Sequence, residues 1–301
     1  MLRIIHQRKY AYAFSLLLTL GSLVVISMYG LRLGIDFKGG TSLEVRFTSE
    51  VTPTTELVSE KLNLLELQSL TIQPTENNGM FIRYHASDEL ANEKALRLLQ
   101  EIDPNVIQLR TDFIGSSVSG QIQRSAFEGT ILSLIGIALY IAWAFRRVSH
   151  PINSWEYGLG AIIALAHDIV ITVGVFSLLG HFLNVEVGVP FIAALLTILG
   201  YSVNDTIVVY DRVRENLIRA RDKSDFEGLV NRSLNETLGR SINTSMTVII
   251  VLLAIAVFGG ESVRWFAVAL LVGVGFGTYS SIYIASALLV TRHGMKLHQS
   301  K

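Results

Sequence analysis

One acidic residue lies inside a long apolar run, where an uncompensated charge is costly. Asp205 belongs to the stretch GYSVNDTIVVYDRVREN, Gly200–Asn216. An acid inside a membrane span costs about 2.5–3.5 kcal/mol, so it usually faces the interior of a helix bundle and often takes part in ion movement. Burial disfavours its charged form and would permit proton exchange near neutral pH. Asn204 is a weaker candidate for the same path. The alternative is structural: an acid that reaches the aqueous interface or caps a helix contact.

Arg240 is the natural partner for Asp205, because it opens a later apolar stretch. At helical spacing Arg240, Thr244 and Thr247 form a polar stripe. An arginine facing Asp205 would stabilise the charged carboxylate and oppose the effect of burial. Such a pair has two states, joined or separated once the acid is protonated. An arginine that merely flanks a span explains the same residue equally well.

His167 and Asp168 lie together in the middle of another apolar stretch. Adjacent residues on a helix point about 100° apart, so they need not act together. A histidine can relay protons at physiological pH. An equally good explanation is a hydrogen-bonding site that holds two helices together. One histidine with scattered acids does not predict a metal site, and the absence of cysteine excludes disulfides and thiolate chemistry.

The elements that carry these residues are expected to be membrane spans. Of the 301 residues, 50% are hydrophobic and only 17% are charged, and net charge is zero, whereas soluble proteins average about a quarter charged residues. No phosphate-binding loop is present, and nothing indicates a nucleic-acid partner. A span needs about 20 apolar residues. Six windows qualify or nearly qualify: Ala11–Gly30, Gly129–Phe145, Tyr157–Leu179, Val187–Tyr210, Ser241–Gly260 and Trp265–Thr291.

The distribution of lysine and arginine predicts the orientation of these spans. The chain ends and alternate loops are basic, whereas the opposite short loops, Gly180–Glu186 and Glu261–Arg264, contain only Arg264. Basic loops stay in the cytoplasm, so both termini are predicted to be cytoplasmic. The predicted layout is residues 1–10 cytoplasmic, 11–30 first span, 31–126 periplasmic domain, 127–291 spans two to six with a cytoplasmic loop at 211–240, and 292–301 cytoplasmic tail. That cytoplasmic loop is interpreted as a solvated connector, or else as an amphipathic surface helix.

The predicted periplasmic domain alternates strand and helix patterns. Strands are expected at Thr41–Thr48, Ser69–Gln73, Met80–His85 and Val106–Ile114, and helices at Pro53–Leu65 and Asp88–Ile102, with Thr52 and Ser87 as caps. The order βαββαβ is typical of a ferredoxin-like domain. The predicted fold is therefore an α-helical polytopic membrane protein with six transmembrane helices, plus an α+β ferredoxin-like domain.

Small residues recur every four positions in the last apolar stretch, at Gly273, Gly277, Ser281 and Ala285. Small residues at this spacing allow helix backbones to approach closely. We therefore expect them to form a packing ridge.

Four motifs resemble those of the SecD/SecF protein-export family, in the same order and over nearly the whole chain. They are GIDFKGGTSLEV (Gly34–Val45), ALAHD (Ala164–Asp168), GYSVNDTIVVYDRVREN (Gly200–Asn216) and SSIYIASALLV (Ser280–Val290). Six spans and one short periplasmic domain are similar to the SecF branch rather than to SecD.

The resemblance implies a membrane subunit that is not an enzyme and has no cofactor other than protons as the coupling ion. It implies pairing with SecD beside the SecYEG channel, often with YajC. It also implies that the subunit pulls or releases an unfolded preprotein with energy from the proton gradient, and that Asp205 and Arg240 belong to the proton path. Two other interpretations stay open. The chain could be half of a proton-coupled small-molecule exporter of the same superfamily, or a passive assembly scaffold.

Overall fold

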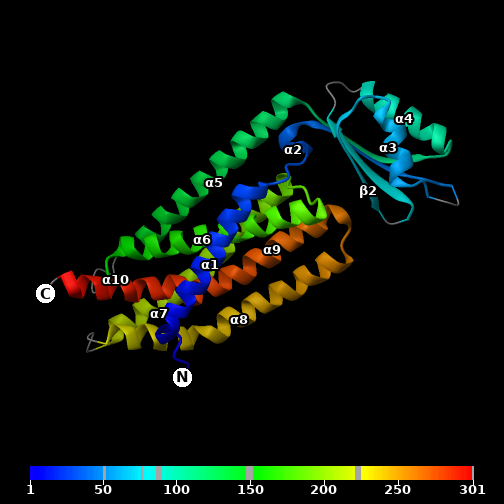
Figure 1. Ribbon diagram of the computed structural model, residues 1–301. Helices are drawn as coiled ribbons and strands as arrows, with labels where there is room; N and C mark the ends of the chain where they lie inside the picture. The colour runs from blue at the N-terminus through cyan, green and yellow to red at the C-terminus, as the bar shows by residue number, and fades with distance from the viewer. Residues whose placement is uncertain (50–51, 76, 86–89, 147–151, 221–224, 300–301) are drawn as a thin grey trace. The chain divides into compact units, whose positions relative to one another are not determined.

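The protein is described by a computed structural model that covers residues 1–49, 52–75, 77–85, 90–146, 152–220 and 225–299. The chain divides into two compact units (Figure 1). The first, here called the helical unit, is Met1–Arg32 together with Glu128–Lys301. The second, here called the sheet unit, is Leu33–Phe127.

Within the described residues, six helices are long and apolar enough to cross a membrane. This confirms the prediction of a polytopic helical membrane protein. The last of the six passes through a π turn, η2. The helices are α1 (Arg8–Tyr29, preceded by the short η1, Ile5–Gln7), α5 (Ser116–Ala144), α6 (Ser154–Leu183), α7 (Val189–Arg219), α8 (Phe226–Phe258), and α9 (Glu261–Ser280) continued by η2 (Ser281–Ala285) and α10 (Ser286–Gln299).

Helix α9 is the centre of the helical unit, because it packs against α6, α7 and α8 (Figure 1). Residues near the two ends of the chain lie at the same end of this unit. The Leu2 backbone amide donates to Asn235 of α8 at 2.7 Å, and the Tyr12 and Thr291 hydroxyls are 2.9 Å apart. At the opposite end, the Val187 amide donates to the Arg32 carbonyl at 2.8 Å.

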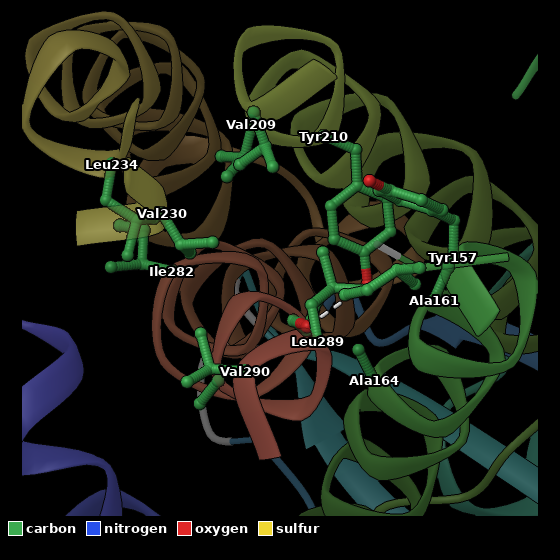
Figure 2. Packing of buried hydrophobic residues seen from close by; sticks show 14 of the residues in the cluster. Tyr157, Ala161, Ala164, Val209, Tyr210, Val230, Leu234, Ile282, Leu289 and Val290 are labelled. Atoms are coloured by element: carbon green, nitrogen blue, oxygen red, sulfur yellow. Dashed lines mark hydrogen bonds between the residues drawn. The ribbon is translucent and has the colours of Figure 1, made fainter. Parts of the chain in front are cut away.

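The apolar core at the end that holds the termini is built around two buried tyrosines (Figure 2). The rings of Tyr157 and Tyr210 meet edge to face at 5.2 Å, and Tyr210 donates its hydroxyl hydrogen to the Ala285 carbonyl at 3.2 Å. Val230 and Leu234 of α8 are fully buried in the same cluster.

This core corrects the prediction for the segment Asp211–Arg240. That segment is neither a separate surface helix nor a solvated connector over most of its length. Helix α7 continues to Arg219 and α8 already begins at Phe226. Val213 and Leu217 extend the buried stripe of α7 at four-residue spacing. The alternating charges occupy the outer faces of two long helices, which is why composition alone suggested a loop.

Among its described residues, the sheet unit contains four antiparallel strands in the order β2-β3-β1-β4, together with helices α2, α3 and α4. Its core joins strand residues such as Leu43 and Ile82 to helix residues such as Leu62 and Leu99, all fully buried. The elements along the chain are α2 (Ile35–Lys38), β1 (Gly40–Arg46), α3 (Thr55–Asn63), β2 (Gln68–Thr75), β3 (Gly79–His85), α4 (Leu90–Ile102) and β4 (Ile107–Ile114).

From β1 to β4 the element types and order agree with those expected from the sequence, whereas the short helix α2 was not predicted and the predicted cap of α3 was wrong. Thr54, not Thr52, caps α3, because its hydroxyl accepts the Leu57 amide at 3.3 Å. The predicted cap Ser87 lies outside the described residues.

Two consecutive glycines begin the sheet, and both have positive φ: 75° at Gly39 and 132° at Gly40. A Cβ on Gly40 would lie 2.6 Å from the Tyr84 carbonyl oxygen of the neighbouring strand. Position 40 therefore needs glycine for its backbone conformation and for its close approach to β3.

Asp103 fastens the end of β1 to the turn after α4. Its carboxylate accepts backbone amides from Thr48 at 2.6 Å and from Ser49 and Asn105 at 3.0 Å. Burial acts to raise the pKa of this carboxyl, but these hydrogen bonds together lower it below its ordinary value of 3.8.

We expect Asp103→Asn to lower the urea midpoint of the sheet unit at neutral pH, because an amide accepts these bonds without the help of a charge. The folded pKa is lowered, so the stabilisation is complete above about pH 4 and is lost as the pH falls through the folded pKa. The difference between wild type and variant should therefore shrink in acid. Circular dichroism of the full chain at neutral and acidic pH measures this. Asp112→Asn is the control, because the half-exposed side chain of this β4 residue pairs with Arg110 and holds no backbone amide of β1. An equal difference at both pH values would contradict the assignment.

Candidate functional site

Asp205 lies inside the helical unit, where three elements meet. Its side chain on α7 is only 6% exposed. It accepts a hydrogen bond from Ser241 of α8 at 2.5 Å and another from Ser281, the first residue of the π turn. The long apolar face of α7 buries this position, and the small serines let α8 and α9 approach it. The structure therefore places the predicted acid within the bundle rather than at its surface.

A second acid, Asp168 on α6, is completely buried. One carboxylate oxygen accepts hydrogen bonds from Ser202 of α7 at 2.6 Å and Ser280 of α9 at 2.7 Å. The other oxygen lies 2.9 Å from Nδ1 of His167. Adjacent side chains on a helix point in different directions, but here the side chains of His167 and Asp168 are in direct contact. Asp168 also links three helices, as the hydrogen-bonding interpretation expected.

The two acids are connected through consecutive residues. Ser280 donates to Asp168 and Ser281 donates to Asp205. The π turn begins at Ser281, and such turns are rare features that often occur at functional sites. The sequence analysis placed Ser281 in a packing ridge. In the structure the hydroxyl of Ser281 also donates a hydrogen bond to the carboxylate of Asp205.

Arg240 is not the partner of Asp205 in this structure. It is exposed, and no ion pair joins these two described residues. Thr244 and Thr247, which share its stripe, are exposed as well. Asn204 also points outward, although it is adjacent to Asp205. The side chain of Ser241, one residue after Arg240, takes the position that the sequence assigned to the arginine.

Close packing between α7 and α9 holds this arrangement. A Cβ on Gly277 would lie 3.0 Å from the Cβ of Ser202, and a Cβ on Gly273 would overlap the side chain of Ile198. The predicted packing glycines of α9 thus pack against the face of α7 that carries Ser202. Their contact allows α9 to bring Ser280 to Asp168.

Sequence reasoning did not assign the hydroxyl groups that bond to the acids. Ser202 and Ser280 donate to Asp168, and Ser241 donates to Asp205. A detectable signal existed: small polar residues recur on apolar helices, where buried hydroxyls need partners. Among the described residues, no group of three or more His, Cys, Asp or Glu side chains is placed to hold a metal ion. The site is therefore a network of carboxylates, hydroxyls and one imidazole.

Within the described residues, six apolar helices, with two buried carboxylates bonded among α6, α7, α8 and the α9–η2 segment, define a polytopic membrane protein with ionisable groups inside its bundle, a combination found in transport proteins. Sequence profiles narrow this class. The profile described as protein export membrane protein SecD/SecF, C-terminal, matches residues 94–294, and the SecD/SecF GG motif matches residues 24–51. The chain belongs to the SecD/SecF family of protein export membrane proteins.

Curated relatives are named protein translocase subunit SecF, a transport component. The Thermobaculum terrenum protein is 42% identical over 97% of this chain and 94% of its own length, and the Haemophilus influenzae protein is 38% identical over 93% and 83%. Among solved structures, SecDF from Thermus thermophilus, described as a translocon-associated membrane protein, superposes with a TM-score of 0.83 at 34% identity. The match covers 96% of this chain but spans only 38% of that SecDF chain.

Proposed function

We propose that this chain is an accessory subunit of the Sec protein-export machinery that works with SecD and uses the proton gradient to drive or complete preprotein translocation. The observation that carries the proposal is the environment of Asp205. Both hydrogen-bond partners of this buried carboxylate, Ser241 and Ser281, are uncharged hydroxyls. Among the described residues no ion pair joins a cation to Asp205. A proton is the simplest group that can neutralise a buried carboxylate.

In this proposal Asp205 and Arg240 form the main proton path, with His167, Asp168 and Asn204 as supporting groups. The exposed position of Arg240 corresponds to the separated state of a two-state pair. Each proton that enters yields about 2.3 kcal/mol per 100 mV, plus about 1.4 kcal/mol per pH unit. Moving a conformational equilibrium from 1:99 to 99:1 needs about 5.5 kcal/mol, which one or two protons supply.

A polar strip on the outer surface of the helical unit supports a membrane partner. Thr197 and Asn204 are exposed on α7, and Arg240, Asn243 and Thr244 are exposed on the neighbouring α8. Polar side chains at membrane depth face protein or a water-filled cavity rather than lipid. We assign SecD as the chain that covers this strip. The solved relative supports this choice, since the matched region is less than half of a single SecDF chain.

The proposed location is the bacterial inner membrane, with both termini in the cytoplasm. Residues near both ends lie at one end of the helical unit, as an even number of spans requires. We further propose that the sheet unit is ferredoxin-like, lies in the periplasm and contacts the unfolded preprotein. Its element order and its strand order β2-β3-β1-β4 support that fold. SecYEG and YajC are the proposed neighbours in the translocase.

Membrane vesicles depleted of this chain, then supplied with it and SecD, test the proposal. We expect the late stage of preprotein translocation to speed up only when a proton gradient is present, and an ionophore to remove the gain. A gain that survives the ionophore would select the passive scaffold instead. Gradient-driven movement of small dyes without any effect on preprotein would select the small-molecule exporter.

A further inference from the structure

The two buried acids of the helical unit are joined by a short covalent and hydrogen-bonded connection. Ser280 donates to Asp168 at 2.7 Å, and Ser281 donates to Asp205. One peptide unit, which separates Cα atoms by about 3.8 Å, lies between these two serines. A displacement of this backbone that weakens one hydrogen bond therefore disturbs the other.

The π turn η2 begins directly at this connection. It begins at Ser281, and its ends are held by side chains: Ser286 donates to the Ser281 carbonyl at 2.9 Å, and Tyr210 donates to the Ala285 carbonyl. A π turn is a one-residue irregularity in an α-helix. Shifting the phase by one residue rotates a side chain by about 100° about the helix axis. A change in this turn would thus reorient the hydroxyl of Ser281 relative to Asp205.

His167 provides an entry for protons to Asp168. Its Nδ1 contacts Asp168 at 2.9 Å, whereas its Nε2 is buried without a hydrogen-bond partner. In the neutral ring that carries hydrogen on Nδ1, Nε2 is a free acceptor. A proton that binds Nε2 converts the ring to imidazolium, and the Nδ1 proton then passes to Asp168. The result is a protonated acid and a neutral imidazole of the other tautomer, so charge and protons balance.

Groups around the two acids do not supply a competing cation. On α9, Tyr279 stacks against His167 and donates its hydroxyl hydrogen to the Ala11 carbonyl of α1. On α7, the Tyr201 hydroxyl donates to Ser245 of α8. On α1 Tyr12 bonds to Thr291, and on α8 Arg240 is exposed. Among the described residues, His167 is thus the basic group in contact with either acid.

We propose that Asp168 is a second proton-binding site, loaded through His167, and that Ser280 and Ser281 transmit its protonation state to Asp205. The two serines act as positioning residues across the π turn. This inference rests on the proposed function in one respect, namely that Asp205 itself binds a proton. It goes further by giving the helical unit two coupled sites and by naming the residues that couple them.

Infrared titration of the protonated carboxyl bands, on the full chain in lipid vesicles, tests the coupling without an export assay. Asp168→Asn should shift the titration midpoint of the Asp205 band by about 0.4 pH unit or more, the lower range for residues that share a hydrogen-bond network. Ser280→Ala and Ser281→Ala should each abolish that shift when combined with Asp168→Asn. Ser202→Ala should retain it, because Ser202 contacts Asp168 but not Asp205.

Ser177→Ala is the matched control, since this buried serine of α6 bonds to backbone carbonyls of α1 and its C-cap instead of to either acid. It should leave both midpoints unchanged. His167→Phe should slow proton uptake by Asp168 after a pH jump by about tenfold or more, as expected when a relay group is lost. Helical circular dichroism establishes that each variant is folded.

If Asp168→Asn leaves the titration midpoint of the Asp205 carboxyl band unchanged, this inference is overturned. The proposed function would still stand if Asp205→Asn blocks export. A carboxyl band of Asp205 that never titrates would overturn both. Coupling that survives Ser280→Ala and Ser281→Ala would show that the acids interact through space, and would remove the role of the serines.

Discussion

Replacing Asp205 by Asn is expected to reduce gradient-driven preprotein export to the level of membranes that lack this subunit. Asparagine keeps one carbonyl oxygen for the hydroxyls of Ser241 and Ser281, but it cannot take up a proton. Each proton that crosses a potential of 100 mV releases about 2.3 kcal/mol. Losing that energy from the rate-limiting step corresponds to a slowing of up to about 50-fold.

Late translocation in energised vesicles measures this effect, with and without an ionophore. Asp211→Asn is the matched control, because Asp211 lies on the same helix but is exposed beside Arg214. The control should export at the wild-type rate, and both variants should accumulate and assemble with SecD normally. Full export by the Asp205→Asn variant would refute a role for this acid in proton coupling. Loss of the protein from the membrane would instead indicate that the carboxylate is structural.

The span pattern and the burial of Asp205 could be predicted because hydrophobicity over about 20 residues is a strong signal. An acid inside such a run is unfavourable next to lipid, so it is expected to face the interior of the bundle. The same reasoning identified Asp168, which the structure finds completely buried. These predictions depend on single helices and their composition, so they needed no knowledge of how the helices pair.

The partners of both acids could not be predicted in the same way. Serines are common and small, and their role depends on which helix lies opposite. The sequence favoured Arg240 because opposite charges attract, but an arginine near the end of a span can extend to water. Counting by fours along α9 placed Ser281 and Ala285 on a packing ridge, and both are completely buried. It did not indicate that a π turn begins at Ser281 or that the Ser281 hydroxyl bonds to Asp205. Such irregularities leave no clear mark in a single sequence.

Replacing Gly273 by Leu is expected to lower the stability of the helical unit by about 1–3 kcal/mol, the usual cost of overpacking. Even a Cβ at this position overlaps the side chain of Ile198, which is fully buried. Helix α9 is therefore expected to move away from α7, which separates Ser280 from Ser202 and disturbs the two hydrogen bonds that they donate to Asp168. We expect gradient-driven export to fall together with stability. Thermal unfolding in detergent and the vesicle assay measure the two effects.

Gly275→Leu provides the control, because Gly275 is exposed on the same helix and a Cβ there meets nothing within 4 Å. A surface change of this kind usually stays within about 0.5 kcal/mol. The double variant Gly273→Leu with Ile198→Ala should recover part of the lost stability, since the smaller alanine makes room for the leucine. Recovered stability with restored export would show that the spacing between α7 and α9 sets the geometry of the acids. If Gly273→Leu unfolds at the same temperature as Gly275→Leu, the two helices cannot pack as closely as the structure places them.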